Sequence, residues 1–171
     1  DYTIVHFKQK FSFNKATGKK ITLSTPASDK YPGDGAFTLV NGVINEKGLA
    51  RSKEFLGFSG ADCEAIIDLG KEEVIKSVTI NFLDQRSSWI YPPGIIHIYM
   101  SNDGVTFKES PNEERGKEIP GEISRNMNAT FYPAANARYI KVVARNFGII
   151  PDGKPGAGNK AWLFVDEIEV K

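Results

Sequence analysis

The sequence has few of the residues that most catalytic and metal sites require. It contains one cysteine and two histidines among 171 residues, so no intrachain disulfide can form. Two histidines are too few for a zinc site of the usual kind. The 22 basic and 21 acidic residues nearly balance, whereas a nucleic-acid-binding domain would show a basic stripe. No segment approaches the run of about 18 apolar residues typical of a membrane-spanning helix.

The usual catalytic motifs are also missing. There is no Gly-x-Ser-x-Gly elbow, no His-Glu-x-x-His and no phosphate-binding glycine loop. Asp166 and Glu167 are adjacent acids, and glycoside hydrolysis needs two carboxylates that flank one bond. Because both acids lie in a predicted strand, we expect their side chains to point to opposite faces. We therefore predict that this chain is not an enzyme, and that Glu167 has a structural or metal-ligand role.

Cys63 and His97 both have ordinary structural interpretations. Cys63 precedes Ala65, Ile66 and Ile67, a pattern that predicts a buried thiol acting as a small hydrophobe. His97 lies between Ile96 and Ile98, so we expect it to face outward from a strand.

What the sequence does contain is a β pattern throughout. Eight candidate strands alternate with Gly- and Pro-rich turns, and Asn102-Asp103-Gly104 is a strong hairpin signal. This spacing is typical of a β-sandwich or jelly roll, and we predict eight antiparallel strands. The candidate strands are residues 21–24, 65–69, 74–83, 95–100, 106–109, 129–132, 138–144 and 162–170. The core should include Ile67, Val78, Ile80, Phe82, Ile98, Ile140, Val142 and Phe164.

The length favours one domain with an N-terminal extension. Forty per cent apolar residues are enough for a two-layer core. We expect residues 31–171 to form the sandwich. Residues 1–30 are polar and Lys-rich, and they remain open between the end of a preceding domain, a linker and an added edge strand. Since the first residue is Asp1 rather than Met, we expect the chain to be excised from a longer protein.

Three segments in order resemble one known family. They are EAIIDLG from Glu64, YMSNDGVTF from Tyr99 and AWLFVDEIEV from Ala161. Together they are similar to the discoidin, or coagulation-factor type C, domain, which includes carbohydrate-binding modules of family 32. Further strings, at residues 15–42, 54–70, 87–93 and 155–170, resemble the C-terminal module of family 20 β-N-acetylhexosaminidases of the chitobiase type.

The resemblance implies a non-catalytic module of a secreted glycoside hydrolase. Such a module would bind a terminal GlcNAc or galactose-type sugar of a glycan, beside a catalytic domain of the same parent chain. The implied location is extracytoplasmic: periplasmic, cell-surface or secreted. Two alternatives stay open. One is a structural domain that packs on the catalytic domain without binding free sugar, and the other is a discoidin-type adhesion or lipid-binding domain.

The resemblance also implies a structural calcium ion. Its ligands would be the backbone carbonyls of Leu39 and Asp166 and the side chains of Asn41 and Glu167, an oxygen-only set as calcium prefers. Many relatives have Asp at the position of Asn41, so this chain has one negative charge fewer there. Asn41-Gly42 can equally be read as a simple turn.

The implied sugar site lies on loops at one end of the sandwich, within residues 84–91, 146–152 and 153–162. Trp89 is either a platform or a core residue, whereas Trp162 is expected in the core. Gly153-Lys154 replaces a Trp-His pair that is frequent in similar modules, which suggests a weakened or altered site. The candidate platforms for sugar C–H faces are Trp89, Tyr91 and Phe147, and the candidate polar partners are Gln85, Arg86, Asn146 and Asn159.

Overall fold

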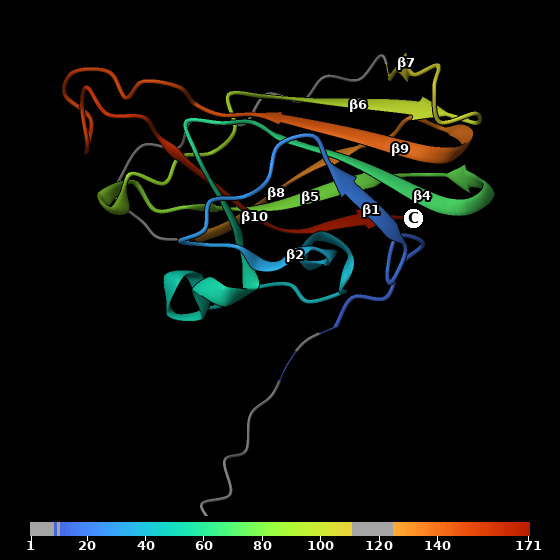
Figure 1. Cartoon of the computed structure of the whole chain (residues 1–171), viewed down its shortest axis with the longest axis horizontal. Helices are drawn as coiled ribbons and strands as arrows, with labels where there is room; N and C mark the ends of the chain where they lie inside the picture. The colour runs from blue at the N-terminus through green and yellow to red at the C-terminus, as the bar shows by residue number, and fades with distance from the viewer. Residues whose placement is uncertain (1–8, 10, 111–124) are drawn as a thin grey trace, which may run out of the picture.

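The chain folds into two antiparallel β-sheets that pack face to face (Figure 1). The structure is a computed structural model, and it describes residue 9 and residues 11–110 and 125–171. The five-stranded sheet has the order β1-β4-β9-β6-β7, and the four-stranded sheet has the order β3-β10-β5-β8. The strands are β1 (Lys20–Leu23), β2 (Gly33–Ala36), β3 (Leu56–Ser59), β4 (Cys63–Ile75), β5 (Val78–Asp84), β6 (Ile95–Ser101), β7 (Lys108–Glu109), β8 (Arg125–Phe131), β9 (Ala135–Arg145) and β10 (Trp162–Val170).

The predicted all-β antiparallel sandwich is confirmed. Short 3-10 turns are the only helices in the described residues: η1 (Phe37–Val40), η2 (Gly48–Glu54) and η3 (Arg86–Ser88). β3 adds a strand that the pattern did not predict. Gly57 within this strand and Gly60 after it are more typical of a loop. A Cβ on Gly57, however, would lie 2.8 Å from both the Phe164 ring and Tyr31 Cβ. Glycine there allows β3 to approach β10 closely.

The predicted strand from 74 to 83 is two strands, joined by a two-residue connection that passes from the five-stranded sheet to the four-stranded sheet. β4 ends at Ile75 and β5 begins at Val78. The intervening amides of Lys76 and Ser77 donate to the carbonyl of Lys171, at 2.6 and 3.1 Å. Because apolar residues flank Lys76-Ser77 on both sides, the pattern did not separate the two strands.

The main core lies between the two sheets, and all eight predicted core residues are buried. Cys63 is buried as expected, and burial raises the pKa of its thiol to about 12. Phe164 belongs to a separate cluster with Phe55, Leu83 and Ile90. The partly buried side chain of Trp162 packs against this cluster. The expected core role of Trp162 is therefore met only in part, because its side chain is half-buried.

The outer faces of the two sheets differ. β10 is buried at every residue from Leu163 to Val170, because the segment containing η1 and η2 covers the outer face of its sheet (Figure 1). β4 instead alternates buried and half-buried residues from Cys63 to Leu69. The outer face of the five-stranded sheet is thus open, with one apolar side and one polar side on each strand.

The N-terminal segment belongs to the sandwich from residue 11 onward. β1 pairs antiparallel with β4, with Ile21 opposite Ile67, and the Lys15 amide donates to the Val170 carbonyl at 2.8 Å. Within the described part of residues 1–30, Lys20–Leu23 form an edge strand. The boundary expected at residue 31 would leave β1 outside the domain, although it completes one edge of the five-stranded sheet.

None of the described helices is long and apolar enough to cross a membrane.

Candidate functional site

Trp89 presents an aromatic ring at one end of the sandwich. It follows η3 with a left-handed backbone, φ 61° and ψ 20°, which is unusual for a bulky residue. Its amide donates to the Arg86 carbonyl at 2.9 Å, and its carbonyl accepts from the Trp162 amide at 2.8 Å. The residue is 41% exposed. Backbone strain of this kind persists only where surrounding contacts impose it, and it is concentrated at ligand sites.

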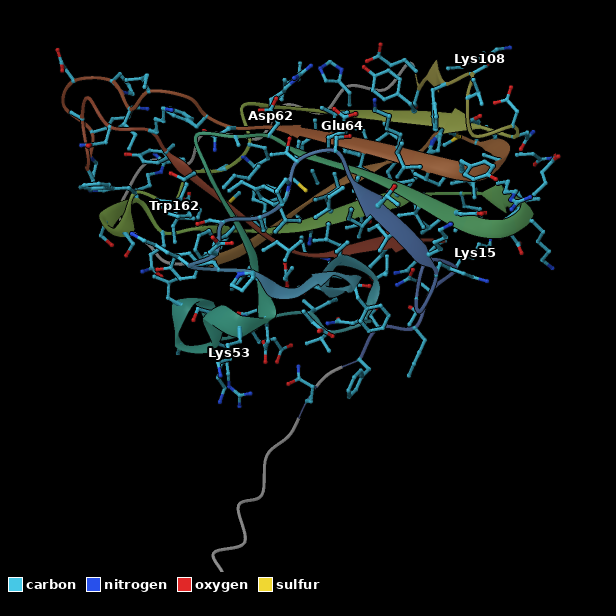
Figure 2. The ribbon with its side chains drawn as sticks, viewed as in Figure 1. Lys15, Lys53, Asp62, Glu64, Lys108 and Trp162 are labelled. Atoms are coloured by element: carbon cyan, nitrogen blue, oxygen red, sulfur yellow. The ribbon has the colours of Figure 1, made fainter. Side chains whose placement is uncertain are left out.

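The β9–β10 loop packs against the Trp89 ring. A Cβ added to Gly156 would lie 2.5 Å from Trp89 Cδ1, so only glycine fits at that position. Figure 1 shows this loop and the η3 turn at the same end of the sandwich, and Figure 2 places Trp162 there as well. The loop therefore covers part of the indole and leaves the rest open to solvent. Of the two readings left open for Trp89, the structure favours the platform.

Arg86 and Gln85 lie beside Trp89 with their side chains already oriented. Arg86 Nε lies 3.2 Å from Asp84 Oδ1 in a buried ion pair, and its guanidinium carbon is 5.6 Å from the centre of the Tyr91 ring. Gln85 Nε2 donates to Ser88 Oγ at 2.7 Å. Both side chains are half-buried, so each is positioned to hydrogen-bond a ligand while its own conformation is fixed.

Tyr91 does not provide a platform, which corrects the expectation from sequence. It is 1% exposed, and its hydroxyl donates to the Pro155 carbonyl at 2.9 Å. Phe147 stacks on it with ring centroids 4.7 Å apart. Tyr91 thus supports the loop from inside, through its contacts with Pro155 and Phe147. Phe147, half-buried above it, is the second platform that remains.

The two predicted asparagines differ in what they do. The Asn146 side-chain amide donates to the Ala161 carbonyl at 3.1 Å, and its Oδ1 accepts from the Gly148 amide at 2.8 Å. These bonds shape the loop and give Asn146 a supporting role, while its binding role stays a prediction. Asn159 is exposed and caps its own turn through the Gly156 carbonyl at 3.1 Å.

Ile149 and Lys154 lie on the same loop, and neither was among the predicted sugar contacts. Ile149 is 59% exposed. Lys154 Nζ lies 5.5 Å from the centre of the Phe147 ring, a cation–π arrangement. The ammonium group of Lys154 gives this end of the sandwich a positive charge beside the Phe147 ring.

A second candidate site surrounds Asp166 and Glu167 on the covered face. A register shift between Val165 and Glu167 interrupts the pairing of β10 with β5, as a β-bulge does. Asp166 Oδ2 accepts from the Asn45 amide at 2.7 Å, and Glu167 Oε2 accepts from the Gly42 amide at 3.1 Å. The expectation of opposite faces is therefore wrong, because the bulge breaks strict alternation and both carboxylates meet one loop.

Burial dominates the acid chemistry of this second site. It raises the pKa of Asp166 to about 7 and that of Glu167 to about 8. Asp166 Oδ1 is buried and has no hydrogen-bond partner in the described part of the chain. Glu169 lies close enough to raise the Glu167 pKa further, and it accepts from Ser12 Oγ. Several acids are thus held out of water with few cations nearby, an arrangement that a bound metal ion would relieve.

The expected calcium ligands occupy this region. Leu39 lies buried in η1, which packs on β10. Asn41 Oδ1 accepts from the Val43 amide at 2.7 Å, so the turn reading of Asn41-Gly42 holds locally. Residues 11–110 and 125–171 contain no group of three or more Asp, Glu, His or Cys arranged to hold a metal. The expected set contains one acid side chain, Glu167, and its other ligands would be carbonyl and amide oxygens. The buried Asp166 Oδ1 would be a further oxygen ligand, which the sequence did not suggest.

Several solved structures share this architecture at low sequence identity. The lectin domain of lectinolysin, complexed with Lewis B antigen, superposes with a TM-score of 0.56 at 16% identity, covering 94% of this chain and 97% of that one. A fucose-binding module of Streptococcus pneumoniae gives a TM-score of 0.55 at 19% identity, covering 92% and 94%. Chitosan-binding module 1 of a Paenibacillus sp. IK-5 chitosanase/glucanase gives 0.56 at 16%, covering 94% and 99%.

The fold is a discoidin-like β-sandwich. Identities below one in five show the shared fold and leave the function open. No family model and no curated protein matches the sequence. The discoidin part of the sequence resemblance is therefore confirmed for the fold, whereas the link to chitobiase stays a prediction.

Proposed function

We propose that this chain is a carbohydrate-binding module that holds a terminal sugar on the loops around Trp89. The observation that carries the proposal is the half-exposed indole of Trp89. The backbone of this residue is held in a left-handed conformation, and the oriented side chains of Arg86 and Gln85 lie beside it. Sugars present an apolar C–H face and several hydroxyls, so a ring with fixed polar neighbours suits them. The structural relatives named for binding fucose, Lewis B antigen and chitosan support this reading.

The remaining residues divide into contacts and supports. Trp89 and Phe147 would supply the apolar platform, Arg86, Gln85 and Asn159 would hydrogen-bond hydroxyls, and Lys154 would lie at the rim. Tyr91 and Asn146 would hold the loop. Because so open a site buries little of its ligand, we expect affinity in the high micromolar to millimolar range, about 4–6 kcal/mol.

The favoured ligand, by resemblance, is a terminal GlcNAc or galactose-type sugar, with fucose added from the structural relatives. We further propose that the module is non-catalytic and serves an extracytoplasmic glycoside hydrolase, such as a β-N-acetylhexosaminidase. The chitosan-binding relative, itself derived from a chitosanase/glucanase, supports an enzyme parent. Binding calcium at Leu39, Asn41, Asp166 and Glu167 would stabilise the module without taking part in sugar contact.

Trp89 fluorescence provides the test. In Trp162→Phe, Trp89 is the only tryptophan, so GlcNAc, galactose and fucose can be titrated against its emission. We expect a saturable change that is lost with Trp89→Ala in calorimetric titration. Tyr132→Ala is the control, because Tyr132 is an exposed aromatic that follows β8, beyond the end paired with the start of β5.

Thermal melting of the same variants separates contact from packing. Loss of binding by Trp89→Ala with an unchanged melting temperature supports the proposal. Unchanged binding by that variant would overturn it. If none of the three sugars binds while vesicles of anionic lipid do, the adhesion or lipid-binding alternative replaces it. If neither binds, the domain is one that packs on its neighbour.

A further inference from the structure

The outer face of the five-stranded sheet, which we call the open face, carries ordered rows of polar and aromatic side chains. The strand registers place Lys20, Asp68, Tyr139 and Ser101 in one row across β1, β4, β9 and β6. The next row contains Thr22, Ile66, Lys141 and Tyr99. With strands about 4.8 Å apart, each row spans roughly 14 Å. None of these residues belongs to the loops around Trp89.

The open face has a shallow hollow of about 200 Å³ where the two rows meet β1. Its lining combines an aromatic ring, an apolar side chain, a hydroxyl, a carboxylate and an ammonium group. This volume is below the usual 300–1,000 Å³ of pockets for drug-sized ligands, so the hollow suits one small ring. The lining residues are Lys20, Thr22, Ile66, Asp68 and Tyr139.

The Tyr139 ring is fixed before any ligand arrives. The Arg138 guanidinium carbon lies 4.9 Å from its centre. A Cβ added to Gly104 would lie 3.1 Å from Tyr139 Cζ, so the β6–β7 loop packs closely against the ring. A ring held by neighbours loses little side-chain entropy on binding, which favours even a weak ligand.

The charges of the open face are matched in pairs. Arg138 contacts both oxygens of Asp68, at 2.8 and 2.9 Å, and this contact lowers the pKa of Asp68 to about 2. Lys141 Nζ lies 2.5 Å from Glu64 Oε1. Figure 2 shows Glu64 near the start of β4. Because acids and bases alternate, an anionic or a cationic ligand would meet a like charge, whereas a neutral ligand that both donates and accepts would not.

Tyr99 extends the surface beyond the hollow. It lies opposite Lys141 on β9, one row from Tyr139, and Lys141 Nζ is 5.8 Å from its ring centre. Diagonal neighbours across a strand pair are about 7–8 Å apart. Two rings at such a distance, with hydrogen-bonding side chains between them, match a chain of sugar rings rather than a single one.

We propose that the open face is a second binding site, for a neutral oligosaccharide lying across the strands from the hollow toward Tyr99. Tyr139 and Tyr99 stack on the apolar faces of its rings. Asp68 accepts from hydroxyls, while Lys20 and the Thr22 hydroxyl donate to ring oxygens. This site does not depend on the loops around Trp89, and it would let one module hold a polymer along its length.

The experiment is a titration of the uniformly ¹⁵N-labelled chain with xylotriose, cellotriose and N-acetylchitotriose. At least one of them should shift the amides of Ile66, Asp68 and Tyr139 at millimolar concentration. Trigalacturonate is the anionic counterpart and should shift them at least tenfold less. Tyr139→Ala should weaken the shifts at Ile66 and Asp68 about tenfold, whereas Phe37→Ala, an exposed residue of η1, should leave them unchanged.

A second variant guards against a folding defect. Thr22→Arg places a long side chain over the hollow from an exposed position of the edge strand, and it should abolish the shifts while the thermal midpoint stays within a few degrees. Absence of shifts at the open face with all three neutral trisaccharides overturns the proposal, as does an equal response to trigalacturonate. The same titration of Trp162→Phe, in which Trp89 is the only tryptophan, reports the loop site separately, so either site can fail alone.

Discussion

The two outer faces of the sandwich are built from the same strand geometry and have opposite surroundings. The face of the four-stranded sheet is covered by η1 and η2, and β10 is buried along its length. On the open face β4 alternates buried and half-buried residues from Cys63 to Leu69. Three lateral ion pairs lie there: Asp68–Arg138, Glu64–Lys141 and Asp62–Arg145. Covering one face fixes the acids of β10 in a dry environment, whereas leaving the other open keeps its acids available to a ligand.

The pKa values of the carboxylates on the two faces are shifted in opposite directions. Burial raises the pKa of Asp166 and Glu167, while the hydrogen bonds from Arg138 and Lys141 lower the pKa of Asp68 and Glu64. The difference shows that residue type alone does not assign a role to an acid. Its burial and its hydrogen-bond partner decide whether the acid is suited to binding a metal ion or a hydroxyl.

The largest expected difference between the faces is in packing. Phe164→Ala removes a ring from the covered face and should lower the free energy of unfolding by about 3–5 kcal/mol, as buried large-to-small changes do. Tyr139→Ala on the open face should cost no more than about 1 kcal/mol, in the range of partly exposed positions. Denaturant unfolding of both variants measures this. Equal losses would show that the open face is as tightly packed as the covered one.

The next difference is in pH dependence. Burial raises the folded-state pKa of Asp166 from 3.8 to about 7 and that of Glu167 from 4.5 to about 8. Between about pH 4 and pH 8 the folded state therefore binds more protons than the unfolded chain, so stability should fall as pH rises. Thermal melts in a chelator should show this decline. Asp166→Asn should flatten it, whereas Asp68→Asn should leave this slope unchanged, because the lowered pKa of Asp68 places its titration below about pH 4.

The next prediction concerns the effect of calcium on the melting temperature. A cation bound at the covered face would offset the ionised carboxylates and stabilise the folded state by mass action. At pH 8 millimolar calcium should then raise the melting temperature, and Glu167→Ala should abolish the increase. An unchanged melting temperature in calcium, with the decline toward pH 8 intact, would mean that these acids are protonated structural groups.

The smallest effect should come from the open-face ion pairs. Arg138→Ala leaves Asp68 at a partly exposed position, where water replaces the lost partner. We expect a change in thermal midpoint of at most about 3 °C, screened further by salt. A larger loss would indicate that the pair holds β4 against β9. In that case Asp68 would have a structural role in addition to the proposed one.

Much of the fold could be predicted from sequence, because alternation in β9 and β10 and the Asp-Gly turn after β6 are local signals. The eight core residues followed from the same alternation. Tyr91 and Asn146 could not be placed, since their partners Pro155 and Ala161 come from a loop that folds back from far along the chain. The pairing of Asp166 with Glu167 depends on a bulge, which two consecutive acids in a strand do not reveal.

The left-handed backbone at Trp89 has a consequence for protein engineering. Glycine adopts that conformation without strain, so selection for thermal stability alone would favour Trp89→Gly, the same substitution that removes the proposed platform. Stability and binding are therefore opposed at a single codon. A library randomised there and sorted separately for each property should diverge, with glycine enriched in one pool and aromatic residues in the other.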